Sequence, residues 1–223
     1  KKNISFLFEK DLSESIWTDR PAFPAGRVWM LDEALAGKSV EEKLGETLDK
    51  VEKEGADSLL LTKLDDLMWL FNIRGCDVEC NPVAMSYAFI SRKETVLFIQ
   101  KAVLEDAAAA SLAAKGVMVE EYGTVTDYLK ELPEGRKVLA DQRQCSYVLY
   151  RTLADRQTVV EKRNPTELLK AVKNTVELAH MEDVYLKDSV ALTKFIYWLK
   201  TNIGKTMITE VTAADHLEML RRQ

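Results

Sequence analysis

Two hydrophobic patterns alternate along the chain up to about residue 162. After Ser39-Val-Glu-Glu42, which has the composition of a capping box, apolar residues recur at helical spacing at Val40, Leu44, Leu48 and Val51. Asp57-Ser-Leu-Leu-Leu-Thr62 is instead a short continuous apolar run, typical of a strand buried on both faces. The two patterns predict helices over residues 40–54, 64–71, 103–115, 124–132 and 146–154, and strands over 57–62, 85–91, 94–100, 117–122, 137–141 and 157–161.

Strands that alternate with helices predict an α/β fold. The strands 85–91 and 94–100 are separated only by Arg92-Lys93, as in a hairpin, so the sheet is expected to be mixed and not purely parallel. We therefore expect a mixed β-sheet flanked by helices, in a domain of residues 1–162.

Residues 1–30 carry few periodic signals, and Pro21 and Pro24 favour an extended backbone there. Disordered linkers normally lack large aromatic side chains, whereas this stretch contains Trp17, Phe23 and Trp29. We interpret it as an ordered strap.

The pattern changes after residue 162. Asn164-Pro-Thr-Glu167 provides an N-cap and a proline at the first helical position, and no strand signal follows. We predict three helices: one with an apolar stripe over residues 168–178, one with a stripe over residues 190–199, and one over residues 209–222. Such stripes need a partner surface, so we interpret residues 163–223 as an all-helical segment that opens a second, truncated domain. We also expect the chain to self-associate through residues 165–223.

Composition and charge exclude some classes of function. The net charge of −5 argues against nucleic-acid and anionic-membrane partners, because acidic residues outnumber basic ones and are interspersed with them. No run approaches the ~18 apolar residues of a membrane-spanning helix, and charge interrupts the first residues too early for a signal peptide. Three cysteines, an odd number, fit reduced thiols better than disulfides. We therefore expect a cytoplasmic protein.

Turn-forming and polar residues are crowded between the apolar runs of residues 64–71 and 83–91. These residues are Asn72, Arg74, Gly75, Asp77, Asn81 and Pro82. Their density indicates a fixed backbone conformation and not a flexible spacer. Arg74 and Asp77 are compatible with a binding pair in a cleft, although an arginine near an aspartate in a turn is more often a structural ion pair.

A group of polar residues in the C-terminal part does not make a complete metal site. Glu177, His180 and Asp183 lie on neighbouring turns of one predicted helix, but half of a dinuclear metal site needs matching carboxylates on other helices. Acidic residues near a histidine are also common on solvated helix faces.

The cysteines do not complete a site either. Cys76 and Cys80 lack two of the ligands that zinc requires, and both histidines lie in the C-terminal helices, away from Cys145. From the residues alone we assign no catalytic residue and no metal ligand.

The stretch from Leu64 to Tyr87 resembles the hallmark passage of the Xaa-Pro aminopeptidases, also called aminopeptidase P. The resemblance rests on the pattern Leu64-Asp-Asp…Trp69-Leu-Phe-Asn72-Ile-Arg74-Gly75-Cys-Asp77…Asn81-Pro82…Ser86-Tyr87. Further blocks follow in the family's order, among them Trp17-Thr-Asp-Arg20-Pro21, Glu42-Lys43, Pro165…Glu167-Leu-Leu-Lys, and Thr209-Glu210. The resemblance covers about residues 10–222 and is closest to the three-domain type.

The resemblance implies a domain organisation. Enzymes of this type have two creatinase/prolidase N-terminal-type domains, which are ribonuclease H-like, and a metallopeptidase domain of the pita-bread fold. Residues 1–162 would be the second domain, and residues 163–223 the opening helices of the catalytic domain.

The resemblance also implies a chemistry for the parent protein. The parent would be a cytoplasmic, homodimeric enzyme that uses two divalent metal ions, usually manganese, to remove the N-terminal residue before a proline. The family's metal ligands lie downstream of Gln223, so this chain is expected to hold no metal and to be inactive by itself. Its role would be that of a scaffold, cleft wall and oligomerisation element, with Asn72, Arg74, Asp77 and Asn81 as candidate cleft-lining residues.

Two alternatives remain open. One is a non-catalytic peptide- or protein-binding module of the same fold, which the sequence beyond Gln223 would distinguish by substituted metal ligands. The other is a dipeptidase or creatinase relative, which is disfavoured because residues 64–87 follow the aminopeptidase pattern so closely.

Overall fold

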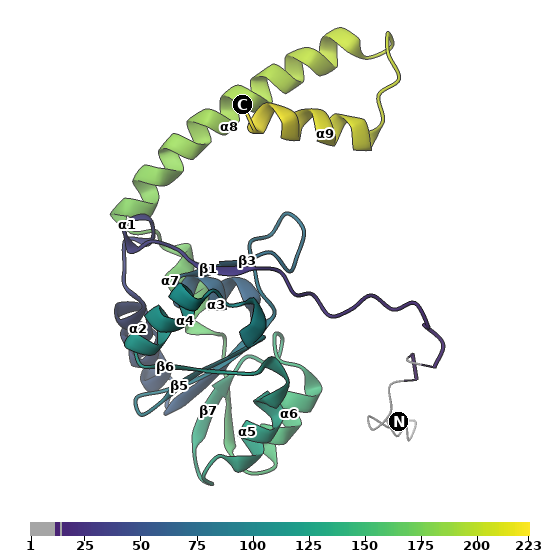
Figure 1. Cartoon of the computed structure of the whole chain (residues 1–223). Coiled ribbons are helices and arrows are strands. Elements are labelled where there is room, and N and C mark those ends of the chain that lie inside the picture. The colour runs from purple at the N-terminus through teal and green to yellow at the C-terminus, as the bar shows by residue number, and fades with distance from the viewer. Residues whose placement is uncertain (1–11, 14) are drawn as a thin grey trace, which may run out of the picture.

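The computed structural model describes residues 12–13 and 15–223 (Figure 1). Within that part of the chain, the central sheet has six strands in the order β6-β5-β4-β2-β7-β8. The strands are β2 (Ser58–Leu61), β4 (Ser86–Ser91), β5 (Thr95–Ile99), β6 (Val117–Glu120), β7 (Lys137–Ala140) and β8 (Thr158–Glu161). β4 runs antiparallel to both of its neighbours, β2 and β5, whereas the other neighbouring pairs are parallel. The predicted mixed sheet and its central hairpin are confirmed.

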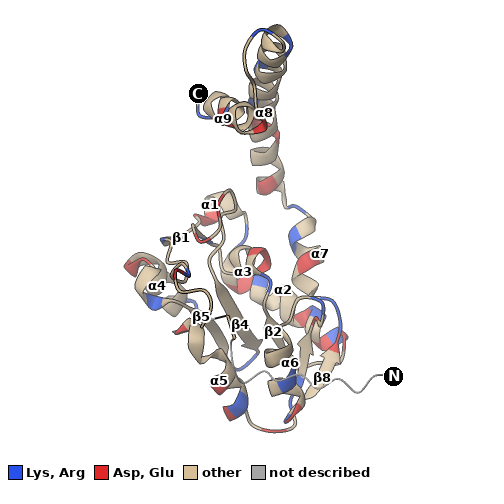
Figure 2. Ribbon diagram, turned by 90° about the vertical axis from the view of Figure 1, so that its right-hand side faces the viewer, with Lys and Arg blue, Asp and Glu red and all other residues tan. Residues whose placement is uncertain are grey.

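Helices cover both faces of this sheet (Figures 1 and 2). One face carries α2 (Val40–Lys53), α3 (Leu64–Leu70) and α4 (Asp106–Ala114), and the other carries α5 (Val125–Glu131) and α6 (Tyr147–Ala154). The five helices predicted for this region are therefore confirmed, with ends shifted by a few residues. The short elements not predicted are α1 (Glu33–Ala36), η1 (Lys101–Val103) and η2 (Tyr122–Thr124).

The capping box that starts α2 is present. The Glu42 backbone N–H donates to Ser39 Oγ at 3.1 Å, and the Ser39 backbone N–H donates to Glu42 Oε2 at 2.8 Å. These bonds satisfy two of the amide groups that a helix start leaves unpaired, so the first residue of α2 lies where the sequence predicts it.

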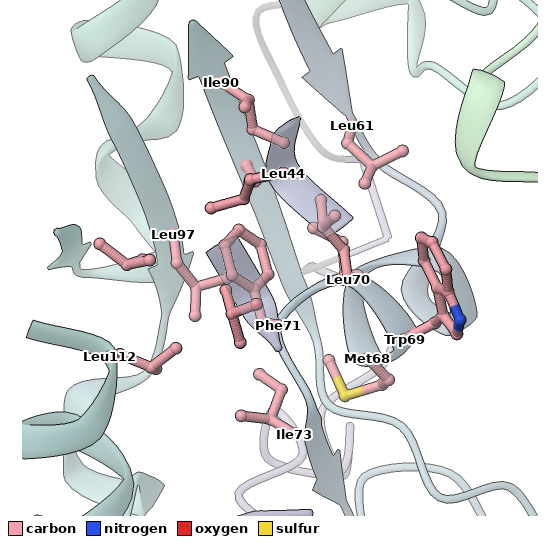
Figure 3. Packing of buried hydrophobic residues seen from close by; sticks show 14 of the residues in the cluster. Leu44, Leu61, Met68, Trp69, Leu70, Phe71, Ile73, Ile90, Leu97 and Leu112 are labelled. Carbon is pink, nitrogen blue, oxygen red and sulfur yellow. The ribbon is translucent and has the colours of Figure 1, made fainter. Parts of the chain in front are cut away.

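The alternation along the strands produces two hydrophobic clusters. All residues of β2 are buried, and Leu59 and Leu61 join the cluster beneath α2, α3 and α4, whereas Leu60 joins the cluster beneath α5 and α6. Figure 3 shows Met68, Trp69, Leu70 and Phe71 in the first cluster. The sheet is thus buried on both faces, as its apolar strands predict.

The sequence pattern does not predict a second, two-stranded sheet, which the structure contains. It pairs β1 (Val28–Met30) antiparallel with β3 (Ile73–Gly75), with Val28 opposite Gly75. Close approach of the chain requires glycine here, because a Cβ at Gly26 would lie 2.6 Å from the Cys76 carbonyl carbon. Strands of three residues are too short to show a period, so only the tertiary contact reveals them.

The predicted strap lies partly outside the described residues, since residues 1–11 and 14 are not described. In its described part the Phe23 ring lies 4.9 Å from the Tyr122 ring, centroid to centroid, and Gln100 Nε2 donates to the Pro24 carbonyl. These contacts hold Phe23 and Pro24 against the edge of the α/β part, whereas the described residues before Phe23 are exposed.

The C-terminal segment is all-helical, as predicted, but its helices are divided differently. The helices are α7 (Pro165–Ala171), α8 (Thr175–Asn202) and α9 (Glu210–Arg221). The prediction of one helix across residues 168–178 and a separate helix across residues 190–199 was wrong. Asn174 and Glu177 form a capping box that starts a new helix, with the Glu177 N–H donating to Asn174 Oδ1 at 2.9 Å.

α7 is anchored to α3 by a buried ionic group. Thr166 Oγ1 donates to Asp66 Oδ2 at 2.8 Å, and Lys170 Nζ lies 2.6 Å from Asp66 Oδ1 and also contacts Asp65. The side chain of Asp66 is fully buried, whereas that of Asp65 is 44% exposed. Because a buried carboxylate needs a paired cation, Lys170 fixes the position of α7.

α8 and α9 project away from the α/β part and pack on each other (Figure 1). The Trp198 and His216 rings stack with centroids 3.8 Å apart, and Arg221 Nε lies 2.6 Å from Asp188 Oδ1. Ala191 is the one buried residue of α8 in this structure. Large apolar side chains therefore remain exposed on these helices, among them Val184, Tyr185, Leu186, Val190, Tyr197 and Val211.

We predict that Asp66→Asn lowers the free energy of unfolding by about 3 kcal/mol, because it leaves Lys170 without its buried partner. Asp65→Asn is the matched control, since Asp65 contacts the same lysine from a solvent-exposed position, and its cost should stay below about 1 kcal/mol. Urea unfolding of both variants measures the difference. Equal costs would contradict the assignment of Asp66 as the anchor.

We predict that the purified chain self-associates through the exposed apolar residues of α8 and α9. Leu186, which is 68% exposed, is a suitable probe, because Leu186→Asp should shift the mass measured by light scattering toward the monomer without unfolding the chain. Val78→Asp, on an exposed loop of the α/β part, should leave the mass unchanged. A wild-type monomer at high concentration would refute this prediction.

Candidate functional site

Asn72, the first of the predicted cleft residues, lies at the end of α3 and is fully buried. Its backbone is left-handed, with φ of 50°, a conformation that asparagine tolerates better than most residues. Its Oδ1 accepts a hydrogen bond from Lys43 Nζ at 2.6 Å, and its Nδ2 donates to the Lys38 carbonyl at 2.9 Å. Asn72 thus joins the end of α3 to the beginning of α2.

Lys43 was not identified from the sequence, although it is only 1% exposed. Its Nζ also donates to the Trp69 carbonyl at 3.0 Å and lies 4.7 Å from the centroid of the Trp69 ring. Burial lowers the pKa of Lys43 to about 8, and the charge of Glu177 opposes this shift. A sequence signal exists, because Lys43 lies one turn after Val40 on the apolar stripe of α2.

Arg74 is half-buried on β3. Its Nη1 donates to the Met68 carbonyl at 3.1 Å and to the Ile73 carbonyl at 2.8 Å. Burial lowers the pKa of Arg74, again opposed by the charge of Glu177. Among the described residues, no carboxylate oxygen lies within 4 Å of the side-chain nitrogens of Arg74 or Lys43.

Arg74 and Lys43 line a common pocket of about 230 Å³. We call it the Lys43–Arg74 pocket. It lies where the α/β part meets the beginning of α8, and its lining residues are Leu31, Leu35, Ala36, Lys43, Trp69, Arg74, Lys173, Glu177, His180 and Met181. The pocket therefore gathers three cations, one carboxylate, one imidazole and several apolar side chains.

The other two predicted cleft residues lie elsewhere. Asp77 accepts hydrogen bonds from the Gly26 N–H through Oδ1 and from the Met85 N–H through Oδ2, both at 2.7 Å. Asn81 is exposed in the loop after β3, beside Cys80, whose φ is 59°. Of the four predicted cleft residues, Arg74 lines the Lys43–Arg74 pocket, whereas Asn72, Asp77 and Asn81 do not. Asp77 holds the stretch before β1 against the beginning of β4 and forms no ion pair with Arg74 within the described residues.

The cysteines show no nucleophilic site. Cys76 and Cys80 are free and exposed. Burial raises the pKa of Cys145 to about 11, so this thiol is protonated at neutral pH and is a poor nucleophile.

Across the described part of the chain, no three His, Cys, Asp or Glu side chains lie close enough together to hold a metal ion. Glu177 and His180 line the Lys43–Arg74 pocket, but Asp183 does not. The described residues therefore do not fit a dinuclear metal site. None of the described helices is sufficiently long and apolar to cross a membrane.

The mixed sheet, its two helical layers and the projecting helices define an α/β domain with a helical extension. The sequence profile of the creatinase/prolidase N-terminal domain matches residues 19–177, and the chain belongs to this family. A domain of this type is what the resemblance to the Xaa-Pro aminopeptidases implies for this part of the chain, so the predicted fold is confirmed.

Individual relatives agree with this assignment. The chain is 33% identical to Xaa-Pro aminopeptidase 1 of Dictyostelium discoideum, over all of this chain and 37% of that protein. It is 35% identical to a probable Xaa-Pro aminopeptidase P of Coprinopsis cinerea, over all of this chain and 38% of that protein. The chain thus spans little more than a third of the length of these relatives.

A solved structure extends the comparison to three dimensions. The X-prolyl aminopeptidase of Caenorhabditis elegans, described as a cytosolic enzyme with a di-nuclear active site, superposes with a TM-score of 0.84 at 28% identity. The match covers 96% of this chain and 36% of that one. The Xaa-Pro dipeptidase of Bacillus anthracis superposes with a TM-score of 0.63 at 15% identity, which shows a common fold alone.

We predict that Asp77→Ala lowers the free energy of unfolding by about 2–4 kcal/mol, because two backbone N–H groups lose a charged acceptor. It should also speed trypsin cleavage after Arg27, since the stretch before β1 loses its attachment. Asn81→Ala, in the neighbouring exposed loop, should change stability by no more than about 0.5 kcal/mol. Unchanged cleavage in Asp77→Ala would rule out the clamping role.

Proposed function

We propose that this chain is the non-catalytic part of a metal-dependent Xaa-Pro aminopeptidase, an enzyme that removes the N-terminal residue before a proline. The observation that carries the proposal is the match to proteins named Xaa-Pro aminopeptidase over the whole chain, α7 to α9 included. The substrate of the parent is then a peptide with proline in the second position.

Residues 1–162 act in this proposal as the creatinase/prolidase N-terminal-type domain, and residues 163–223 as the first helices of the catalytic domain. The last strand of the sheet ends at Glu161, which supports a boundary near residue 162. The exposed apolar side chains of α8 and α9 support an assignment to a separate domain. The chain itself serves as scaffold, cleft wall and oligomerisation element.

The metal chemistry belongs to the remainder of the parent in this proposal. The parent holds two divalent metal ions, which we propose to be manganese. The di-nuclear active site of the Caenorhabditis elegans enzyme supports the presence of two ions. In this proposal the metal ligands lie in the remainder of the parent, beyond this chain. We further propose that the parent is cytoplasmic, like that enzyme, and a homodimer.

The test compares two proteins. We predict that the purified 223-residue chain neither cleaves a short Xaa-Pro peptide in the presence of manganese nor binds manganese tightly in calorimetry. A longer protein, which continues through the sequence encoded after codon 223, should cleave the peptide and lose activity with a chelator.

The possible results separate the candidates. Manganese-dependent cleavage by the 223-residue chain alone would overturn its non-catalytic role. A folded longer protein that binds Xaa-Pro peptides without cleaving them would instead favour the non-catalytic binding module.

A further inference from the structure

The Lys43–Arg74 pocket contains more positive charge than its own residues neutralise. Lys43 is fully buried and donates to two neutral oxygens, Asn72 Oδ1 and the Trp69 carbonyl. Arg74 is half-buried and donates only through Nη1, to two backbone carbonyls. Since a buried charge without a counter-ion is costly, the pocket is electrostatically suited to an anion.

The hydrogen-bonding geometry of Arg74 indicates which type of anion the pocket would bind. Nε and Nη2 form one edge of the guanidinium plane, and within the described residues neither atom donates to a protein oxygen. This edge matches the two oxygens of a carboxylate, which arginine binds through two parallel hydrogen bonds.

The lining of the pocket favours a singly charged ligand with an apolar body. Glu177 lies on the pocket wall and repels a dianion such as phosphate more strongly than it repels a monoanion. Leu31, Leu35, Trp69 and Met181 supply apolar wall on the same cavity of about 230 Å³. This combination is typical of sites that orient a ligand by a few polar groups and bury its hydrocarbon part.

We propose that the Lys43–Arg74 pocket is a binding site for a carboxylate that carries an aliphatic side chain. Arg74 binds the carboxylate through its Nε–Nη2 edge, Lys43 supplies the second positive charge, and the apolar wall holds the aliphatic group. Two sources present this chemistry, a free branched-chain organic acid and the C-terminal residue of a short peptide. The proposal does not depend on peptidase activity anywhere in the parent.

The primary test is calorimetry on the 223-residue chain with 4-methylpentanoate, against the uncharged 4-methylpentanamide. The acid should bind at least about tenfold more tightly than the amide, since a charge-assisted hydrogen bond is lost with the amide. Added salt should weaken binding of the acid and not of the amide. Equal binding of the two compounds, or binding of neither, would overturn the proposal.

Variants locate the site. Arg74→Met should weaken binding of the acid at least about tenfold. Arg92→Met is the matched control, because Arg92 pairs with Asp49 and Glu52 on the surface, away from the pocket, and it should bind like wild type. Circular dichroism establishes that each variant is folded, and unchanged affinity in folded Arg74→Met would refute the site.

A measurement on the wild-type chain keeps the test decisive if Arg74→Met does not fold. In a nuclear magnetic resonance titration the indole N–H signal of Trp69 should shift with 4-methylpentanoate, while those of Trp17 and Trp198 should not. An unshifted Trp69 signal at saturation would contradict binding in this pocket.

A third ligand distinguishes the two sources. The tripeptide Ala-Ala-Leu with a free carboxylate should bind at least as tightly as 4-methylpentanoate if the pocket takes peptide C-termini, and its C-terminal amide should not. Binding of 4-methylpentanoate with exclusion of the tripeptide would identify a free organic acid as the ligand.

Discussion

The buried amide of Asn72 is the contact on which the arrangement around the pocket depends. It accepts from Lys43 and donates to the Lys38 carbonyl, while its backbone carbonyl accepts from the Leu31 N–H at 2.7 Å. One residue in a left-handed conformation therefore joins α2, α3 and the end of β1, through its side-chain amide and its backbone carbonyl. Because Asn72 and Lys43 are both buried, the loss of either side chain leaves the other with an unpaired polar group.

A second asparagine continues this arrangement to the C-terminal helices. Asn174 Nδ2 donates to the Ala36 carbonyl at 2.9 Å, two residues before the carbonyl bound by Asn72. The turn at residues 36–38 is thus held from both sides, and Gly37 leaves no room for a side chain, since a Cβ there would lie 2.3 Å from Asn174 Oδ1. The same asparagine caps α8, so the beginning of α8 is positioned by the α/β part even though its distal turns are exposed.

The sequence predicted what depends on local periodicity and missed what depends on contacts distant in the chain. Alternation and continuous apolar runs were sufficient for β2, β4 and β5, and the Ser39–Glu42 pattern was sufficient for the start of α2. The break before α8 had an equivalent pattern in Asn174 and Glu177, but the apolar stripe that continues across it concealed the signal. β1 and β3 have no local pattern, because each exists only through pairing with the other.

The same distinction applies to the four predicted cleft residues. Composition identified the turn after α3 as rich in polar and turn-forming residues, but it could not show which way each side chain points. Asn72 and Arg74 lie near Lys43, whereas Asp77 binds Gly26, a partner 51 positions away in the sequence. To identify Lys43 as buried, one would have had to argue against the usual rule. A lysine on an apolar stripe is more often a surface residue whose hydrocarbon chain covers the core.

The charges around α3 explain how the chain tolerates two unpaired cations. Asp65 and Asp66 lie in the first turn of α3, whereas Lys43 and Arg74 donate to the Trp69 and Met68 carbonyls in its last turn. This distribution follows the helix dipole, which favours anions at the first turn and cations at the last. At the first turn Lys170 pairs with both aspartates and Lys63 Nζ lies 3.8 Å from Asp65 Oδ2, so two lysines balance two carboxylates there. At the last turn the dipole supplies only about half an elementary charge. The pocket lining adds one carboxylate, Glu177, against Lys43, Arg74 and Lys173, so positive charge remains for a ligand.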